Sequence, residues 1–302
     1  MRSFFRIPGS SAVGGLLLLA LAGAAAAQPS QEEQRLKLLG YLKSWVEPTE
    51  PFRIAGPIHY VGTKGLAAYL ITTPNGHILL DGGLPRSAED VEASIRKLGF
   101  EPRDIRLLLI THAHIDHAGT TEHFMKLSAA EAAVMDRDFE NLKSGGKTDP
   151  VYGKKPPFHF PGVTAERVLK DGDTVAVGKI TMMARLTAGH TQGATTWIVG
   201  VEDGGKIYNV VFPCCTGVNP DYRLVVNPSY PGIADDYRGT FRLLELIKPD
   251  IWLGAHTETF GFEEKRGRAA TEGVGAWVDP EGYRRFIAAE KASFEALVAK
   301  EK

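Results

Sequence analysis

The segment THAHIDHAG, residues 111–119, constrains this chain more than any other. It follows the apolar run IRLLLI, where a buried strand is expected to end, and it carries His112, His114, Asp116 and His117. Side chains two residues apart in a strand share a face, so the first two histidines are expected on one side, with the aspartate and the third histidine at the start of a helix. Imidazole and carboxylate together suit zinc. The spacing therefore predicts a site for two neighbouring metal ions.

Two further histidines stand in similar places. His190 follows the strand-like run TMMARLTAG, and His256 ends the run IWLGAH, so a strand is expected to end at each. Taken alone, each is more typical of a hydrogen-bonded core or loop histidine. Taken with the cluster, they complete a site. The remaining histidines are assigned no role: His59, His77, His123 and His159.

The segments THAHIDH, AGHTQGATTW and GAH, in this order and approximate spacing, resemble the metallo-β-lactamase superfamily. The resemblance covers nearly the whole chain after Trp45, and it implies an α/β fold, a four-layer αβ/βα sandwich with metals at the rim between two sheets. The interleaved strand and helix patterns of two similar halves agree with that architecture. The segments ILLDGGLP, NPSYPGIADDYRGTF and LGAHTETFGF resemble subclass B3 within the superfamily.

This resemblance implies a zinc-dependent β-lactamase. Two Zn²⁺ ions are expected, one bound by His112, His114 and His190, and one bound by Asp116, His117 and His256. The three-histidine set and Asp116 are expected to act in catalysis, in which a metal-bound hydroxide opens the β-lactam amide bond and so confers β-lactam antibiotic resistance. Zinc lowers the pKa of a bound water to about 7, so no serine nucleophile is required. Thr191 and Thr216 are expected to contact the substrate.

Other hydrolases of the superfamily share the first histidine cluster. Lactonases, glyoxalase II-like thioesterases and RNA-processing nucleases resemble one another in a bridging aspartate between the last two histidines. The corresponding stretch here, NVVFPCCTG, has no carboxylate, and Asp221 is the nearest candidate. This favours a β-lactamase, while a lactonase, a thioesterase and a non-catalytic periplasmic zinc-binding protein stay as alternatives.

The two adjacent cysteines, Cys214 and Cys215, are the only ones in the chain. Subclass B3 enzymes resemble one another in a serine near this point, where Thr216 falls, whereas B1 enzymes have a cysteine that binds the second zinc. Either cysteine is therefore a candidate ligand. The favoured interpretation is an inert buried pair, because His117 is present as well. On that interpretation Cys215→Ser leaves the zinc content unchanged.

The N-terminus has the pattern of a secretory signal peptide over residues 1–27. Arg2 and Arg6 provide a positive region, residues 12–22 are apolar, and residues 25–27 are small before the expected cleavage site. A single hydrolase domain is expected over residues 28–302, and the periplasm is the expected location. The formal net charge of −1 gives no reason to expect nucleic acid. The expected partner is a small β-lactam, with no membrane contact after cleavage, and a monomer is expected.

Capping residues and prolines mark where the expected helices begin. Helices are expected from Ser87, acting as the cap, to Leu98, from Ile233 to Ile247, and from Pro280 onward. The loop at 144–162, rich in Gly, Pro and Lys, is long enough to indicate a functional role.

Asp81 stands at the end of the strand pattern GHILLD, near the expected metal site. Two interpretations stay open for it: a carboxylate that fixes the tautomer of a ligand histidine, or a turn residue of the Asp-Gly type.

Overall fold

The apolar run that precedes the histidine cluster forms β5 (Ile105–Leu109), a strand buried on both faces. Leu107 and Leu109 lie in the apolar core between two sheets, whereas Leu108 lies in a second core under the outer helices. A strand covered on both faces needs apolar residues at successive positions. This explains why the run lacks the alternation of a half-exposed strand.

The computed structural model describes residues 40 and 42–302. The predicted signal peptide, residues 1–27, lies outside the described residues, as does most of the polar stretch before Trp45. The described residues belong to one compact unit. No helix in the described part of the chain is long and apolar enough to cross a membrane.

The first sheet has seven strands in sequence order. The pairs from β1 to β4 are antiparallel, and the pairs from β4 to β7 are parallel. Besides β5, its strands are β1 (Phe52–Ala55), β2 (Ile58–Tyr60), β3 (Tyr69–Thr73), β4 (Gly76–Leu80), β6 (Glu131–Met135) and β7 (Arg167–Leu169).

The second sheet has five strands in the order β12-β11-β10-β9-β8. All its pairs are antiparallel except β11 with β12. Its strands are β8 (Thr174–Val177), β9 (Ile180–Leu186), β10 (Thr195–Asp203), β11 (Lys206–Phe212) and β12 (Ile251–Trp252).

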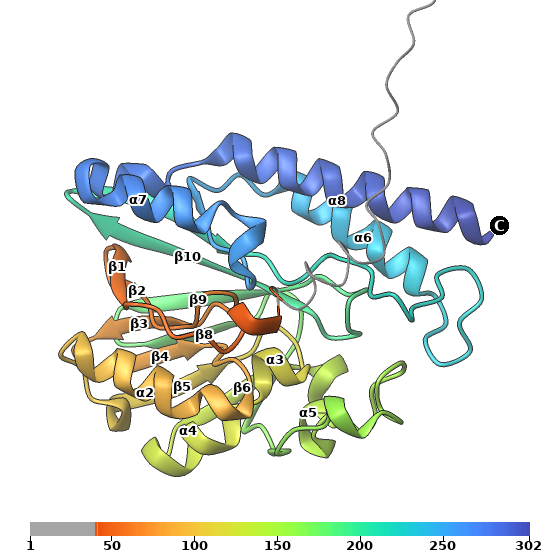
Figure 1. Cartoon of the computed structure of the whole chain (residues 1–302), viewed down its shortest axis with the longest axis horizontal. Helices are drawn as coiled ribbons and strands as arrows, with labels where there is room; N and C mark the ends of the chain where they lie inside the picture. Colours follow the sequence, from red (N-terminus) through yellow and green to blue (C-terminus); the bar gives the residue numbers. More distant parts are fainter. Residues whose placement is uncertain (1–39, 41) are drawn as a thin grey trace, which may run out of the picture. The chain divides into compact units, whose positions relative to one another are not determined.

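The helices lie on the outer faces of the two sheets, as Figure 1 shows. α2 and α4 pack on the first sheet, and α6 and α8 pack on the second. Their bounds are α2 (Ala88–Lys97), α3 (Ile115–Ala118), α4 (Thr121–Ser128), α5 (Phe139–Ser144), α6 (Ile233–Leu246), α7 (Phe262–Glu272) and α8 (Pro280–Glu301). The predicted four-layer αβ/βα sandwich is confirmed.

One core joins the facing sides of the two sheets. Leu80 and Leu109 from the first sheet belong to the same buried cluster as Trp197 and Phe212 from the second. The Trp197 Nε1–H donates to the carbonyl oxygen of Ile110, directly before the histidine segment. The sandwich therefore holds the end of β5 against the second sheet.

One local expectation is confirmed in part and another is wrong. Ser87 and Leu98 flank α2 as its N-cap and C-cap, as expected, but the Ser87 side chain makes no capping hydrogen bond, because the 3₁₀ turn Pro85–Ser87 runs directly into α2 and gives Ser87 helical rather than extended backbone angles. β12 ends at Trp252, so His256 lies on the segment after the strand instead of ending it. The expected helices at 233–247 and from Pro280 are confirmed to within one residue.

Candidate metal centre

A tight turn, rather than strand alternation, brings the first two histidines together. β5 ends at Leu109, and the His114 N–H donates to the carbonyl oxygen of His112, two residues back, which closes a γ-type turn. α3 begins immediately afterwards and carries Asp116 and His117 in its single turn. The expected placement of these two at the start of a helix is confirmed.

His190 completes a three-histidine set with His112 and His114. One ligand atom from each of the three lies within 4.8 Å of the others, and all three side chains are buried. Gly189 precedes His190 with φ of +138°, and a Cβ there would lie 2.7 Å from the Tyr237 ring. Only glycine fits this close approach, so the residue before His190 shapes the turn that points the histidine at its partners.

Hydrogen bonds leave one nitrogen of each histidine for a metal. The His112 Nε2 atom is buried without a hydrogen-bond partner. His190 Nδ1 lies 2.7 Å from the Gly217 carbonyl oxygen, which leaves its Nε2, and His114 Nε2 lies 3.1 Å from Asp149 Oδ2, which leaves its Nδ1. A buried, unpaired ring nitrogen is costly unless something binds it. The three free nitrogens fit a metal ion.

Burial keeps two of these imidazoles neutral, as a metal ligand must be. Burial lowers the pKa of His112 well below its ordinary value and lowers the pKa of His190 to about 3. Burial also acts to lower the pKa of His114, but the hydrogen bond to Asp149 and the negative charges of Asp149, Asp116 and Asp138 together outweigh it and raise that pKa. Asp149 thus increases the basicity of this imidazole.

Asp116, His117 and His256 form a second donor set beside the first. The His117 Nε2 to His256 Nε2 distance is 3.2 Å, and Asp116 Oδ2 lies 3.3 Å from the first nitrogen and 3.5 Å from the second. Ligands about 2.0–2.2 Å from a tetrahedral zinc lie roughly 3.3–3.6 Å apart. The three atoms are therefore spaced like the ligands of one zinc-sized ion.

The charges within this second set are mutually stabilising. Burial acts to raise the pKa of Asp116, but His117 and His256 outweigh it and hold that pKa well below its ordinary value. Burial acts to lower the pKa of His117, but Asp116, Cys215 and Asp81 together outweigh it, so the histidine pKa is raised. The carboxylate is therefore ionised and ready to bind a cation.

His256 lies on a segment that is held in place by contacts with residues from the N-terminal part of the chain. It forms an isolated β-bridge with Leu66, and the next residue, Thr257, donates its N–H to the Gly65 carbonyl oxygen. The Trp45 ring packs at 5.4 Å from the His256 ring. Packing from a distant segment, rather than a strand end, sets the position of this ligand.

Asp81 serves both of its proposed roles. Its backbone has φ of +55°, a left-handed value found in turns, and its carboxylate accepts hydrogen bonds from the Thr111 N–H and Oγ1–H. The same carboxylate lies 3.0 Å from His117 Nδ1. It therefore fixes the tautomer of His117 and leaves Nε2 for the metal.

Two carboxylates that sequence analysis did not single out support the histidines. Asp149, from the 144–162 loop, contacts His114. Asp138, before α5, accepts hydrogen bonds from the Ala113 N–H and the Gly193 N–H, so it ties the two histidine-bearing segments together. Both lie in polar, turn-rich stretches where aspartate is common, and only the three-dimensional structure distinguishes them.

The two threonines predicted to contact substrate have their hydroxyl groups bound by carboxylates. Thr191 Oγ1–H donates to Asp138, and Thr216 Oγ1–H donates to Glu290 on α8. Both threonines are buried. Their role toward a substrate stays a prediction.

The segment after β11 contains no carboxylate near the donor sets. Its two cysteines lie in different surroundings. Asp221 is exposed and paired with Lys155. The Cys214 Sγ is buried 3.5 Å from the Thr111 carbonyl oxygen, whereas the Cys215 Sγ lies 3.9 Å from His117 Nε2. Burial acts to raise the pKa of Cys215, but His256 and His117 outweigh it and lower that pKa to about 7.

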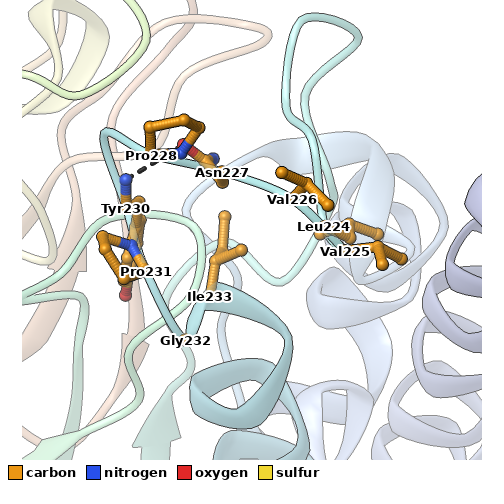
Figure 2. A pocket seen from close by; sticks show the side chains of 9 residues that line it. All are labelled: Leu224, Val225, Val226, Asn227, Pro228, Tyr230, Pro231, Gly232 and Ile233. Carbon is orange, nitrogen blue, oxygen red and sulfur yellow. Dashed lines mark hydrogen bonds between the residues drawn. The ribbon is translucent and has the colours of Figure 1, made fainter.

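A hollow of about 350 Å³ lies on the loop before α6, lined by residues 224–228 and 230–233 (Figure 2). Figure 2 shows the hydrogen bond from the Tyr230 N–H to Asn227 Oδ1 that shapes the turn. The Tyr222 hydroxyl donates to the His190 carbonyl oxygen and so joins this loop to the metal-binding turn. None of the six predicted ligands lines the hollow.

The remaining histidines lie apart from the two donor sets. His59 and His77 pack on Phe100, His123 pairs with Glu92, and His159 bonds the Gly153 carbonyl oxygen.

Comparison with solved structures places the whole architecture among metallo-β-lactamases. The chain superimposes on the native FEZ-1 metallo-β-lactamase from Legionella gormanii with a TM-score of 0.83 and 41% identity, covering 84% of this chain and 97% of that one. BJP-1, a subclass B3 metallo-β-lactamase of Bradyrhizobium japonicum, gives a TM-score of 0.82 and 37% identity, covering 86% of this chain and 97% of that one.

Curated relatives are more varied in activity. An N-acyl homoserine lactonase, AttM, from Azorhizobium caulinodans is 25% identical over 168 residues, which is 46% of this chain and 61% of the lactonase. The first two curated relatives are matched over 36% and 61% of their own lengths. The family model described as the metallo-beta-lactamase superfamily matches residues 63–256, more than half of the chain. These ligands, this sandwich and these likenesses identify the chain as a member of the metallo-β-lactamase superfamily, most similar to subclass B3.

Proposed function

We propose that this protein is a two-zinc β-lactamase that hydrolyses the β-lactam amide bond. The observation that carries the proposal is the pairing of a three-histidine donor set with an Asp-His-His set on a fold that matches subclass B3 enzymes over nearly their whole length. The exposed position of Asp221, which pairs with Lys155, also supports it, because hydrolases of other superfamily branches are expected to have a bridging carboxylate in this segment.

Bound zinc would supply an activated water and polarise the substrate carbonyl. The chain's own residues prepare the place for it. His112, His114 and His190 present three ring nitrogens, and Asp116 places a negative charge beside them. Asp149 hydrogen-bonds the side of His114 that faces away from the ion, so the ring orientation is set before a ligand binds.

A hydrolysis panel tests the proposal. Purified, metal-loaded protein is assayed on a chromogenic cephalosporin, an N-acyl homoserine lactone and an acyl-coenzyme A thioester, with and without a chelator. We expect chelator-sensitive turnover of the cephalosporin at a kcat/KM at least about tenfold above that of the others. His190→Ala is expected to lose turnover and bound metal while keeping the wild-type circular dichroism spectrum, because its side chain lies at the rim of the sheets.

A lactonase or thioesterase is the second candidate, favoured by the curated relatives that carry those names. The same panel separates the candidates, since preferential turnover of the lactone or the thioester would replace the β-lactamase proposal. Metal binding without turnover of any of the three would point to a zinc-binding protein.

We further propose that the protein acts in the periplasm after removal of residues 1–27 as a signal peptide. The positive, apolar and small-residue regions of that segment support this. Mass spectrometry of the protein from a periplasmic extract should give an N-terminus at Gln28, and a cytoplasmic full-length chain would contradict the proposal.

A further inference from the structure

The segment of residues 216–225, which follows β11, holds His190 from two directions. The His190 Nδ1–H donates to the Gly217 carbonyl oxygen at 2.7 Å, and the Tyr222 hydroxyl donates to the His190 carbonyl oxygen at 2.5 Å. The first contact orients the ring, and the second fixes the backbone that carries it. The orientation of this ligand therefore depends on where the 216–225 segment lies.

The 216–225 segment has no regular secondary structure of its own. β11 ends at Phe212 and α6 begins at Ile233, and the structure, which describes every residue between them, places neither a helix nor a strand there. Backbone N–H groups of such a segment need partners other than those of a helix or a sheet. Neighbouring elements must therefore hold the segment in position.

Two glutamates of α8 bind the two ends of this segment. Glu290 Oε2 accepts the Thr216 Oγ1–H at 3.1 Å. Glu301 Oε2 accepts the N–H groups of Leu224 at 2.7 Å and of Val225 at 3.0 Å. Hydrogen bonds to an ionised carboxylate are roughly twice as strong as those between neutral groups. The segment is thus tied to α8 at both ends.

α8 is a firm support because its other contacts lie in the core. Phe294 and Val298, which lie between Glu290 and Glu301 on the same helical face, are 1% and 3% exposed. Glu301 does not stabilise the helix itself, since a negative charge in the last turn opposes the helix dipole. Its carboxylate instead binds the two N–H groups of the 216–225 segment.

We propose that Glu290 and Glu301 are positioning residues for His190: they tie the 216–225 segment to α8 and so hold the imidazole beside the other two histidines of its donor set. Groups that orient a ligand histidine from behind raise the metal affinity of a site. The inference rests on the metal site of the proposed function and not on the substrate. It assigns part of the metal affinity to the last helix of the chain.

A second contact to the same segment provides a contrast. Asp221 pairs with Lys155, and the two side chains are 60% and 40% exposed. An exposed ion pair between two flexible side chains contributes little. Unlike Glu290 and Glu301, this pair is therefore not expected to hold the segment in place.

A site-resolved zinc titration tests the inference. Zinc-loaded protein containing ¹⁵N-labelled histidine is titrated with a chelator of known zinc affinity, and NMR follows the imidazole signals of His190 and His256 separately. In Glu290→Ala/Glu301→Ala, the zinc dissociation constant at His190 should rise by at least about tenfold, whereas that at His256 should stay within about twofold of wild type. The proton signal of the His190 Nδ1–H should be lost, because a displaced Gly217 carbonyl leaves it open to exchange with water.

A conservative pair of substitutions and two controls separate positioning from a general effect. Glu290→Gln/Glu301→Gln keeps an acceptor oxygen at each position, so zinc affinity at His190 should return to within about threefold of wild type. Glu295→Ala removes a glutamate of the same helix that pairs with Arg238. This variant and Asp221→Asn should leave the dissociation constant at His190 unchanged.

Glu301→Ala alone guards against a folding defect in the double variant, because this exposed side chain lies at the end of α8. It leaves the other anchor in place and should raise the constant at His190 by about threefold. An unchanged constant in either alanine variant, an equal rise at His190 and His256, or failure of the glutamine pair to restore affinity would each overturn the inference. Wild-type protein that binds no zinc would overturn it together with the proposed function. A lack of cephalosporin turnover alone would defeat only the proposed function.

Discussion

Single carboxylates decide how the metal-binding imidazoles are oriented. Asp81 holds His117 and Asp149 holds His114, and each bonds the ring nitrogen that faces away from the metal position. Such partners fix the tautomer and raise the basicity of the ligand. Asp149 comes from a loop with no ligand of its own, which explains why that loop matters to the site.

Asp149→Asn should therefore weaken metal binding at the three-histidine set. The amide keeps the shape of the side chain but loses the charge that raises the pKa of His114. We expect the zinc dissociation constant of this site to rise by about 10- to 100-fold, measured by competition with a chromophoric chelator. Asp221→Asn is the matched control, because that carboxylate is exposed and pairs only with Lys155. Equal zinc affinity in the two variants would remove the role assigned to Asp149.

Glu290 on α8 is a half-buried acid that touches the site through Thr216. Burial raises its pKa, and the hydrogen bond from Thr216 lowers it by less. A carboxyl group with a raised folded-state pKa does not reduce the stability of the fold at a pH below its unfolded-state pKa of 4.5. It destabilises the fold increasingly as the pH rises through that value and through the raised one.

Glu290→Gln should therefore gain stability relative to wild type as the pH increases from about 4 to about 8, measured by urea unfolding. Glu295→Gln, on the same helix, should behave oppositely. The hydrogen bond from Arg238 lowers the pKa of Glu295, so the stability that this acid contributes is present above its unfolded-state pKa. A pH-independent difference for Glu290→Gln would show that the acid is not destabilising.

At the scale of elements, the junction between α7 and α8 combines a helix cap with a buried charge. The Asp279 carboxylate accepts the Gly282 N–H at the start of α8 and lies 2.9 Å from the buried Lys265 Nζ on α7. Pro280 follows the cap at the first helical position, where its fixed φ suits a helix start. One side chain thus begins the last helix and neutralises a cation.

Asp279→Ala should destabilise the protein by about 2–4 kcal/mol, through loss of the cap and through an uncompensated buried lysine. Asp279→Asn can still cap the helix and should lose only the ion pair. Its free energy of unfolding should therefore lie between those of Asp279→Ala and wild type. Guanidinium unfolding measures both differences. Equal effects of the two substitutions would mean that the cap contributes nothing.

The sequence predicted those elements whose signals are local. β5 was evident from its apolar run, and α8 from its proline and helical spacing. Ser87 stands at the predicted N-cap position but makes no side-chain hydrogen bond, because the preceding proline starts a 3₁₀ turn. His256 lies beyond its strand because a bridge to Leu66 holds it.

In the site, the six ligands were predicted because they follow a compact motif and two strand-like runs. Asp138 and Asp149 were not, since nothing in their own segments marks them. The side of the chain to which each cysteine turns depends on the backbone after β11 and on the packing of His112, which a sequence pattern does not contain.

At the scale of the whole molecule, the metal centre joins the two halves of the sandwich. The first sheet's end provides His112, His114, Asp116 and His117, while His190 and His256 come from the half that builds the second sheet. Metal that binds only this assembled arrangement stabilises the folded state by mass action.

Removing the metal should therefore lower the thermal midpoint. A free zinc concentration about 100-fold above the dissociation constant contributes about 2.7 kcal/mol per site, which corresponds to a shift of roughly 5–10 °C for a domain of this size. Differential scanning calorimetry with a chelator, and then with zinc added back, measures the shift. Restoration by zinc and not by calcium is expected, because nitrogen ligands suit zinc. An unchanged midpoint would mean that the fold does not depend on the ions.

The distance along the chain between the first ligand, His112, and the last, His256, has a consequence for biogenesis. A chain emerging from a ribosome or a translocation pore holds four of the six donors long before the other two arrive. An ion at the Asp-His-His set would be captured only after the segment behind β12 has docked near Leu66, so metal loading there would report the completion of folding. A shortage of zinc would then leave a protein that is fully synthesised but unfinished, and such molecules are the natural substrates of quality-control proteases.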